Sequence, residues 1–292
     1  MLDTGLKGKI AIITGANNPY GIGAGIAKAF ANQGIRLFLH YFRPPIVGEV
    51  VPSLTDKPGE LFYTAQSQKT ADEVLTNLRE LGAEAVAWEA DLGVETAVST
   101  LFDAAEKALG PVDIVVNNAA YWEADTFVPV KGSTRNKMVE MWTARPQTIN
   151  AGSIDRIFAV NTRAVALIMA EFAHRQVQRN AEWGRIINIS TAGAYVFPSE
   201  VTYGAGKLAL EGYTRSAATE LGQFGITVNT ISPGPIQTGY ITPEMEEQLL
   251  PTIPMGRLGT PKDIGDTAVF LASNQAQWIT GQRLYVGGGH GM

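Results

Sequence analysis

The stretch GRIINISTAGAYVFPSEVTYGAGK, residues 184–207, decides the fold predicted for this chain. Its first part, 184–190, is rich in isoleucine and predicts a strand buried in a parallel sheet. The segment 202–224 is rich in Ala, Leu and Gly, lacks proline, and predicts a helix. The stretch therefore predicts a buried strand followed by a helix.

Three polar side chains occupy defined places in this stretch. Ser190 closes the predicted strand, and Tyr203 and Lys207 are four residues apart on the predicted helix, so the latter two share one helix face. Open α/β sheets bind ligands at the carboxyl ends of their strands, where Ser190 is expected to lie. The alternative is a surface Tyr and Lys near a strand end with no common role.

The chemistry of these residue types favours proton transfer. A free phenol has a pKa of about 10, and a neighbouring ammonium favours its ionised form. Tyr203 is therefore predicted to be the general acid of a carbonyl reduction, or the base of the reverse reaction. Ser190 is predicted to donate a hydrogen bond to the substrate oxygen as charge develops there.

Short β-branched runs alternate with Ala-rich helical stretches along the whole chain. Strands are predicted at 9–14, 36–41, 83–89, 112–117, 184–190, 226–232 and 283–286. Helices are predicted at 21–33, 70–81, 95–109, 153–179, 202–224 and 262–272. This alternation is typical of the α/β class, and predicts a Rossmann-type, doubly wound parallel sheet in a single domain, 1–292, with helices on both faces.

Two segments interrupt this rhythm, 44–67 with Pro44, Pro45, Pro52 and Pro58, and 122–150. Both follow carboxyl ends of predicted strands. Loops of this length in compact domains are often functional, so these insertions are candidate lids or subunit contacts. The alternative is a neutral surface insertion.

A glycine-rich loop connects the first predicted strand with the first helix. Glycines there let the backbone approach a pyrophosphate, and the helix amino terminus adds unpaired N–H groups. The residues predicted to bind a dinucleotide in this loop are Gly15, Asn17, Tyr20, Gly21 and Ile22. Because Ile26 occupies the last position of a literal G-x-G-x-x-G, an ordinary glycine turn is the alternative.

The end of the second predicted strand indicates the choice of cofactor. An acidic residue there would bind the ribose hydroxyl of NAD, whereas an Arg suits the extra phosphate of NADP. The segment 39–43 contains Tyr41 and Arg43 but no acid, so both are predicted cofactor residues and NADP(H) is favoured over NAD(H). The alternative is that Arg43 is a solvated loop residue.

Composition excludes several classes of function. The net charge of −5 and the pI near 5.3 do not favour nucleic acid as a partner. The chain contains no cysteine and three histidines, so disulfides and thiolate sites are excluded and no metal site is predicted. An apolar signal core is absent, as is a run of about 18 apolar residues, so a cytoplasmic protein without membrane contact is expected.

Taken together, the motifs resemble the short-chain dehydrogenase/reductase family, including members similar to 3-oxoacyl-carrier-protein reductases. The resemblance spans nearly the whole chain, and rests on Thr14-Gly15 with Gly21-Ile22-Gly23, Asp91-Leu92, Asn117-Asn118-Ala119, Asn161, Ser190, Tyr203-x-x-x-Lys207 and Pro233-Gly234-Pro235-Ile236-x-Thr238. It implies a catalytic set of Asn161, Ser190, Tyr203 and Lys207. It also implies a homo-oligomer, a tetramer or dimer, that acts on a small-molecule carbonyl substrate.

The resemblance implies individual roles for several residues. Asp91 and Leu92 would flank the adenine, and Asn118 and Ala119 would line the cofactor cleft. Asn161 would hold a water that relays protons to Lys207, which would also bind the nicotinamide ribose. Ile236 and Thr238 would contact the carboxamide, beside Pro233 and Gly234. Asn117 is expected to brace the strands instead of binding ligand.

Some positions depart from the family pattern. Five residues separate Gly15 from Gly21 where three are usual, and Ala120 replaces a glycine. The longer loop is similar to that of enoyl-carrier-protein reductases, but their Tyr-to-Lys spacing of seven is absent, which favours carbonyl reduction. The side chains expected around the substrate are Tyr121, Trp122, Tyr195, Phe197, Tyr240 and Met245.

The predicted function is therefore NADP(H)-dependent reduction of a ketone, with 3-oxoacyl thioesters among the candidate substrates. One alternative is an NAD(H)-dependent alcohol, sugar or steroid dehydrogenase on the same scaffold. A further alternative is a non-catalytic dinucleotide sensor.

Overall fold

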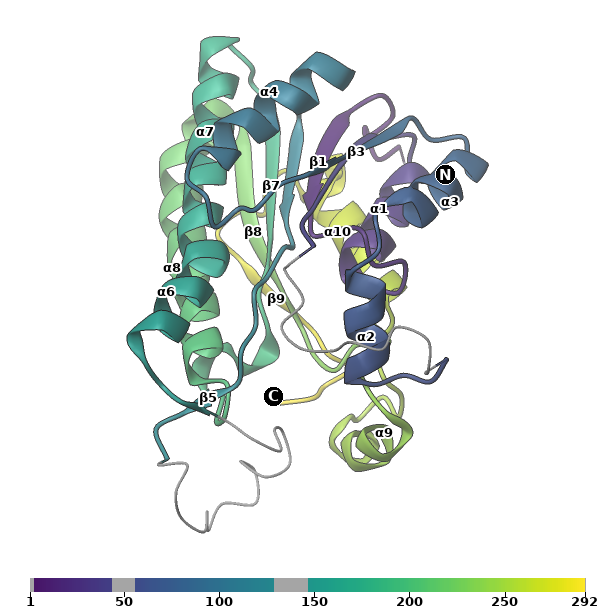
Figure 1. Cartoon of the computed structure of the whole chain (residues 1–292). Coiled ribbons are helices and arrows are strands. Elements are labelled where there is room, and N and C mark those ends of the chain that lie inside the picture. The colour runs from purple at the N-terminus through teal and green to yellow at the C-terminus, as the bar shows by residue number, and fades with distance from the viewer. Residues whose placement is uncertain (1–2, 44–55, 129–146, 292) are drawn as a thin grey trace.

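The computed structural model of the protein describes residues 3–43, 56–128 and 147–291. Its centre is a seven-stranded sheet of order β3-β2-β1-β4-β7-β8-β9, in which all pairs are parallel (Figure 1). The strands are β1 Ile10–Thr14, β2 Arg36–Tyr41, β3 Ala85–Glu89, β4 Ile114–Asn117, β7 Gly184–Ile189, β8 Ile226–Pro233 and β9 Arg283–Val286. The strand order reverses between β1 and β4, the kind of point at which such sheets bind ligands.

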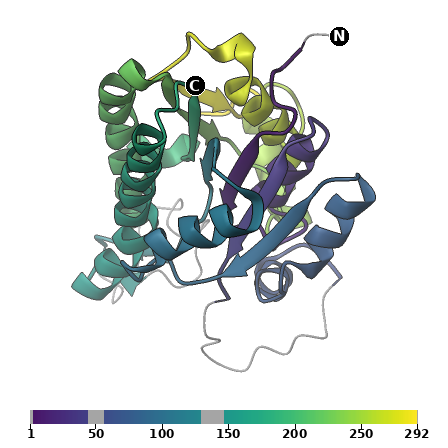
Figure 2. The same ribbon diagram turned by 90° about the horizontal axis from the view of Figure 1, so that it is seen from above.

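Helices cover both faces of the sheet, as the sequence predicts. One face carries α1 Ile22–Ala31, α3 Asp72–Glu80 and α10 Pro261–Ala272, and the other carries α4 Ala97–Leu109, α7 Val165–Gln178 and α8 Val201–Leu221. In Figure 2, the teal α7 and the green α8 lie on the opposite side of the sheet from the purple α1. The predicted doubly wound α/β fold is confirmed.

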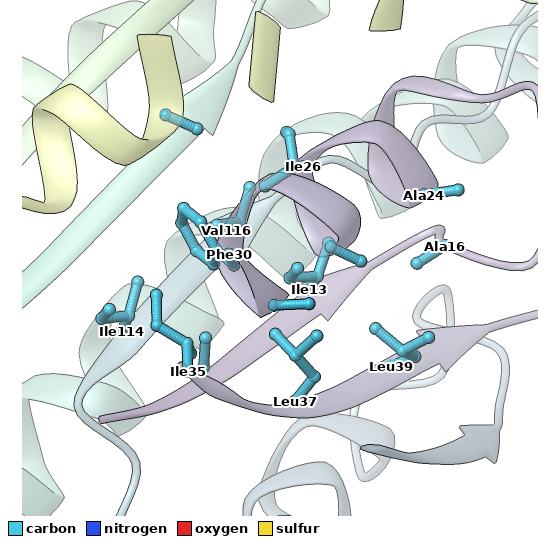
Figure 3. Close-up of a cluster of buried hydrophobic side chains, with 14 of the residues drawn as sticks. Ile13, Ala16, Ala24, Ile26, Phe30, Ile35, Leu37, Leu39, Ile114 and Val116 are labelled. Carbon is cyan, nitrogen blue, oxygen red and sulfur yellow. The ribbon is translucent and has the colours of Figure 1, made fainter. Parts of the chain in front are cut away.

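The two core clusters follow from the alternation of side chains along buried strands. In β1, Ile13 packs with Phe30 of α1, whereas its neighbour Ile12 packs with Phe102 and Phe172 on the opposite face. Figure 3 shows the first cluster, with Phe30 against strands β1, β2 and β4. Both faces of the sheet are therefore apolar, which explains the nearly continuous hydrophobic runs in the sequence.

The predicted helix 153–179 is interrupted in the structure. It consists of α6 Ala151–Phe158, a π-helical turn Ala159–Ala164, and α7. The combined stretch Ala151–Gln178 is the one described helix long and apolar enough to cross a membrane, but half of its apolar window is buried within the fold. It packs as a core helix against α4 and α8.

Several short elements were not predicted, three of them within the two insertions and one after β8. They are α2 Glu60–Ser67, β5 Asp125–Thr126, β6 Gln147–Thr148 and α9 Pro243–Leu249. In Figure 1, α2, α9 and β5 lie at one end of the molecule, below the carboxyl ends of the strands. The predicted loop residues Pro44, Pro45 and Pro52 lie outside the described residues.

The helix α2 rests against two segments that are distant in sequence. The Gly59 N–H, just before the helix, donates to the Gly239 carbonyl at 2.8 Å, and the Phe62 ring packs edge-on against Tyr20 at 5.2 Å. Because α2 is only eight residues long, it depends on such tertiary contacts. It therefore links the glycine-rich loop to the segment after β8.

A chain of buried polar side chains crosses the sheet beneath α8. Asn117 Nδ2 donates to Asn188 Oδ1 at 2.8 Å, and Asn188 Nδ2 donates to Thr214 Oγ1 at 2.8 Å. Thr230 Oγ1 donates to the same Thr214 oxygen at 3.0 Å. Asn117 therefore braces the strands, as expected from the sequence.

Replacing the central residue of this chain should destabilise the fold. We expect Asn188→Ala to lower the free energy of unfolding by about 1–3 kcal/mol, because it leaves the buried Asn117 amide N–H without its acceptor and removes one of the donors to the Thr214 hydroxyl. Urea denaturation measures this change. The exposed Thr219→Ala on α8 should change stability by less than about 0.5 kcal/mol, and equal effects of the two variants would contradict the role given to Asn188.

Candidate active site

Helix α8 and strand β7 bring Tyr203 and Lys207 together at the carboxyl edge of the sheet. Lys207 is 1% exposed, and its Nζ donates to the Ile189 carbonyl at 2.8 Å. The same Nζ lies 5.7 Å from the centroid of the Tyr203 ring. The predicted phenol and ammonium therefore share one helix face, with the ammonium fixed to the end of β7.

The electrostatics of this pair differ from the sequence-based expectation. The pKa of Tyr203 is raised, because burial disfavours the phenolate and the Glu200 carboxylate and Tyr63 add to this effect. The pKa of Tyr203 is therefore raised overall instead of lowered as expected, because burial is the largest effect on it. Burial also lowers the pKa of Lys207 to about 8, although Glu211 opposes that shift.

Ser190 lies close to these residues, but its hydroxyl has a different partner from the one expected. Its Oγ donates to Glu211 Oε1 at 2.6 Å, and both residues are buried. Arg283 Nε of β9 forms a salt bridge with the same oxygen at 2.9 Å. Neither Glu211 nor Arg283 was singled out from the sequence, although Glu211 continues the four-residue spacing of Tyr203 and Lys207.

Asn161 lies in the π-helical turn and holds the chain after β4. Its Oδ1 accepts the Tyr121 N–H at 2.8 Å, and its Nδ2 donates to the Tyr121 carbonyl at 2.9 Å. Such turns are frequent at functional sites. The proton relay implied for Asn161 stays a prediction.

The glycine-rich loop fits a phosphate-bearing cofactor. Gly15 has φ +69°, and a Cβ there would lie 2.8 Å from the Cα of Ala119. A Cβ on Gly23 would lie 2.5 Å from the Gly15 carbonyl oxygen. Gly21, at the amino terminus of α1, provides no side-chain cap, so the first N–H groups of the helix are available to an anion.

Neighbouring residues of the loop hold its shape. Asn118 Nδ2 donates to the carbonyls of Thr14 and Gly15 at 2.9 and 2.8 Å, so the predicted Asn118 and Ala119 do lie beside Gly15. Asn17 Nδ2 instead donates to the Ser67 and Lys69 carbonyls, both at 2.8 Å, and so fixes the end of α2. Ile22 is half-buried and Tyr20 half-exposed at the start of α1.

Beside the end of β2, Arg43 contacts Glu89, the last residue of β3, a contact that the sequence did not indicate. Arg43 Nε and Nη2 each donate to a different Glu89 carboxylate oxygen at 2.8 Å, and both side chains are partly exposed. Tyr41 lies beside them, and burial and Glu89 raise its pKa. The Arg43 guanidinium, which was predicted to bind the phosphate of NADP, therefore already forms an ion pair with the Glu89 carboxylate.

The other predicted cofactor residues lie around the same edge. Asp91 Oδ1 accepts the Gly93 N–H at 2.7 Å, while Leu92 is buried against the α4 face. A Cβ on Gly234 would lie 2.6 Å from the Cα of Gly287, so the chain after β8 passes close to the carboxyl-terminal segment. Pro233 ends β8, with Ile236 buried and Thr238 half-buried beyond it.

Aromatic side chains from three segments gather beside Glu200. Trp122 Nε1 donates to Glu200 Oε2 at 2.7 Å, and the Trp122 ring contacts Tyr240 edge-on at 6.3 Å. Tyr63 of α2 contacts Tyr240 at 5.8 Å. Burial and the neighbouring Asp125 raise the pKa of Glu200 to about 7. Tyr63 extends the predicted aromatic surroundings of the site, and Glu200 adds a carboxyl group to them.

The remaining predicted aromatic and Met residues have separate positions. Phe197 packs edge-on against the Tyr203 ring at 6.0 Å. Tyr195, 59% exposed, instead lies 4.5 Å from the Arg283 guanidinium, and Met245 packs against the small cluster around α9. The predicted surroundings are thus assembled only in part.

Comparison with known proteins supports an oxidoreductase. A family model described as enoyl-(acyl carrier protein) reductase matches residues 46–290. An uncharacterized oxidoreductase, YjdA of Bacillus subtilis, is 34% identical over 96% of each chain. A short-chain type dehydrogenase/reductase of Picea abies is 34% identical, covering 97% of this chain and 93% of its own. A hydroxynaphthalene reductase-like protein, Arp2 of Metarhizium brunneum, is 31% identical over 97% and 95%.

Solved structures agree with these relatives. A short-chain dehydrogenase/reductase of Serratia marcescens has a TM-score of 0.75 at 27% identity, covering 98% of this chain and 99% of its own. A protein described as a short-chain alcohol dehydrogenase of Sinorhizobium meliloti has a TM-score of 0.75 at 28% identity, covering 97% and 96%.

The lowered pKa of Lys207 should appear in the pH dependence of stability. Between about pH 8 and 10.5 the unfolded chain holds a proton that the folded chain has lost, so stability rises with pH in that interval. Relative to Lys207→Met, the wild-type protein should gain about 3 kcal/mol there, measured by urea denaturation. The exposed Lys262→Met serves as the control and should show no such gain; a flat difference for both variants would contradict the lowered pKa.

Proposed function

Because the chain belongs to the short-chain dehydrogenase/reductase family, we propose that it transfers a hydride between NADP(H) and a ketone or secondary alcohol. The observation that carries this proposal is the placement of Tyr203 and Lys207 on one face of α8 at the end of β7, at the sheet edge where β1 leads into the glycine-rich loop. A bound nicotinamide dinucleotide supplies or accepts the hydride. The protein has to provide the proton and the orientation of the carbonyl.

Tyr203 is the proposed proton donor. Its raised pKa keeps the phenol protonated at neutral pH, so it can give its proton to a substrate oxygen that becomes basic as hydride arrives. Lys207 stabilises the phenolate left behind, because its ammonium lies beside the ring. Asn161 holds the Tyr121 backbone in the segment after β4. A protonated phenol is the state that carbonyl reduction requires of the proton donor.

Apolar or ring-bearing ketones are the proposed substrates. Trp122, Tyr240, Tyr63 and Phe197 supply aromatic faces close to Tyr203 and Glu200. The name of the Arp2 relatives, hydroxynaphthalene reductase-like proteins, agrees with a cyclic substrate. A 3-oxoacyl thioester is the second candidate, because the matching family model is described by an acyl carrier protein reductase. The four-residue Tyr203-to-Lys207 spacing supports carbonyl over double-bond reduction.

NADP(H) is the proposed cofactor, with Arg43 as the contact to its extra phosphate. Glu89 competes for the same guanidinium, so phosphate binding requires Arg43 to exchange one anionic partner for another. We further propose a cytoplasmic homo-oligomer, a tetramer or dimer, formed through the helices that carry Asn161 and Tyr203.

Tyr203→Phe should abolish the reaction without abolishing cofactor binding. We expect kcat to fall by about a thousandfold or more, because the variant lacks the proton donor, while NADPH affinity changes less than about threefold. Steady-state NADPH oxidation with a ketone series of graded size, including a cyclic ketone and a 3-oxoacyl thioester, measures turnover.

The same experiment separates the alternatives. Turnover of Tyr203→Phe equal to the wild type would reject Tyr203 as the acid. A wild-type protein that binds NADPH but turns over no carbonyl in the series would instead favour a dinucleotide sensor.

Cofactor choice can be tested with two variants of one ion pair. Arg43→Ala should weaken NADPH binding by about tenfold or more and leave NADH binding nearly unchanged, because only NADPH carries the extra phosphate. Glu89→Gln should strengthen NADPH binding by about threefold to tenfold, since the competing carboxylate charge is gone. Fluorescence titration measures both. A selective loss of NADH affinity in Glu89→Gln would show that Glu89 binds the ribose, and would favour NAD(H).

A further inference from the structure

The predicted substrate contact of Ser190 is at odds with the hydrogen bond that this hydroxyl makes. Its Oγ donates its single proton to Glu211 Oε1 at 2.6 Å, and the residue is 4% exposed. A hydroxyl has one proton to donate. Donation to a substrate oxygen would therefore require Ser190 to leave a buried carboxylate that holds it by a short, charge-assisted bond.

The alternation of side chains along β7 explains why Ser190 points away from the dinucleotide side. Ile186 packs in the core under α4, α7 and α8, and Asn188 bonds Thr214 of α8. Ser190, two residues further, bonds Glu211 of the same helix. Ile187 and Ile189 pack instead in the cluster with α1 and α10.

Thr191 continues this alternation at the sheet edge. The Ser190 N–H still pairs with the Ile231 carbonyl of β8 at 2.8 Å, and Thr191 is extended with φ −149° and ψ 151°. Its side chain therefore points to the side opposite Ser190, above Ile189. That is the side of α1, whose amino terminus and Gly15 form the cofactor loop.

The Thr191 hydroxyl is oriented by one hydrogen bond that it accepts, and its own proton stays available for donation. The Gly193 N–H donates to its Oγ1 at 3.3 Å, and no residue in the described ranges accepts a hydrogen bond from it. The residue is half-buried rather than enclosed. An oriented hydroxyl with a proton to donate is the group that carbonyl reduction needs at the substrate oxygen.

A buried ion pair fixes the backbone at this position. Arg283 Nη2 donates to the Thr191 carbonyl at 3.1 Å, while its Nε contacts Ser232 Oγ at 2.8 Å and Glu211 Oε1 at 2.9 Å. Tyr195 and Tyr285 each lie against the guanidinium, at 4.5 and 4.2 Å. Glu211 therefore connects Ser190 to the arginine that holds Thr191.

We propose that the Thr191 hydroxyl, and not that of Ser190, donates the hydrogen bond to the substrate oxygen in this chain. Ser190, Glu211 and Arg283 are positioning residues that hold the Ser190–Thr191 segment. This inference rests on the proposed carbonyl reduction and changes only the identity of the donor.

Three variants separate the two hydroxyls. Thr191→Val, which keeps the shape of the side chain, should lower kcat by about a hundredfold or more, the effect of losing one preorganised donor. Thr191→Ser should retain activity within about tenfold, because it keeps the hydroxyl. Ser190→Ala should lower kcat by less than about tenfold. NADPH affinity, measured by fluorescence titration, should stay within about threefold of wild type in all three variants.

The opposite ranking, with Ser190→Ala severely impaired and Thr191→Val nearly normal, would overturn the proposal. A crystal structure of the wild-type protein with NADP⁺ gives a readout that does not need turnover. Thr191 Oγ1 should lie within about 3.5 Å of Tyr203 Oη, with Ser190 Oγ still on Glu211; exchanged positions would reject the inference. Absence of turnover in the wild type would reject the proposed function alone, because the crystal structure still identifies the hydroxyl nearest to Tyr203.

Discussion

A buried ammonium is the constraint on which the site depends. Lys207 is 1% exposed, and its Nζ is tied to the Ile189 carbonyl at the end of β7. Burying a charge is costly unless it is paired, and here a backbone carbonyl and the more distant Glu211 offset that cost. The hydrogen bond from Lys207 to Ile189 therefore sets the position of α8 along β7. It also sets the position of Tyr203, which lies one helical turn before Lys207. These interactions do not offset the cost of burial completely, so the pKa of Lys207 stays lowered.

Two carboxylates act on the site from different directions. Glu200 lies before Tyr203 on the chain and disfavours its phenolate, whereas Glu211 lies after Lys207 and favours its ammonium. Both therefore keep protons on the residues between them. Arg283 compensates Glu211, while Glu200 has the Trp122 indole as its hydrogen-bond partner. A phenol kept protonated and an ammonium kept charged are the states that proton donation to a carbonyl requires.

The sequence predicted the sheet and most of its helices, because the central strands β1, β4, β7 and β8 are fully buried and their sequences are apolar runs. The predicted parallel sheet also placed four site residues at its carboxyl edge, because the carboxyl ends of parallel strands meet there. These residues are Gly15, Asn118, Tyr203 and Lys207. Short elements such as α2 and β5 were missed, because they depend on tertiary contacts instead of local pattern. The partners of Ser190 and Arg43 were missed for a related reason. Glu211, Arg283 and Glu89 meet them only after strands far apart in sequence have paired, and spacing alone does not indicate such contacts.

The short helix α2 also bears on how this site could diversify. It contributes Tyr63 to the aromatic surroundings, yet it is held by a few contacts, among them the Asn17 amide and the Gly59–Gly239 hydrogen bond. This helix takes no part in the hydrogen bonding of the central sheet. Part of the aromatic surroundings of the site therefore belongs to a short helix outside the central sheet. Substitutions in this eight-residue segment can change substrate selectivity while the positions of Tyr203 and Lys207 stay the same.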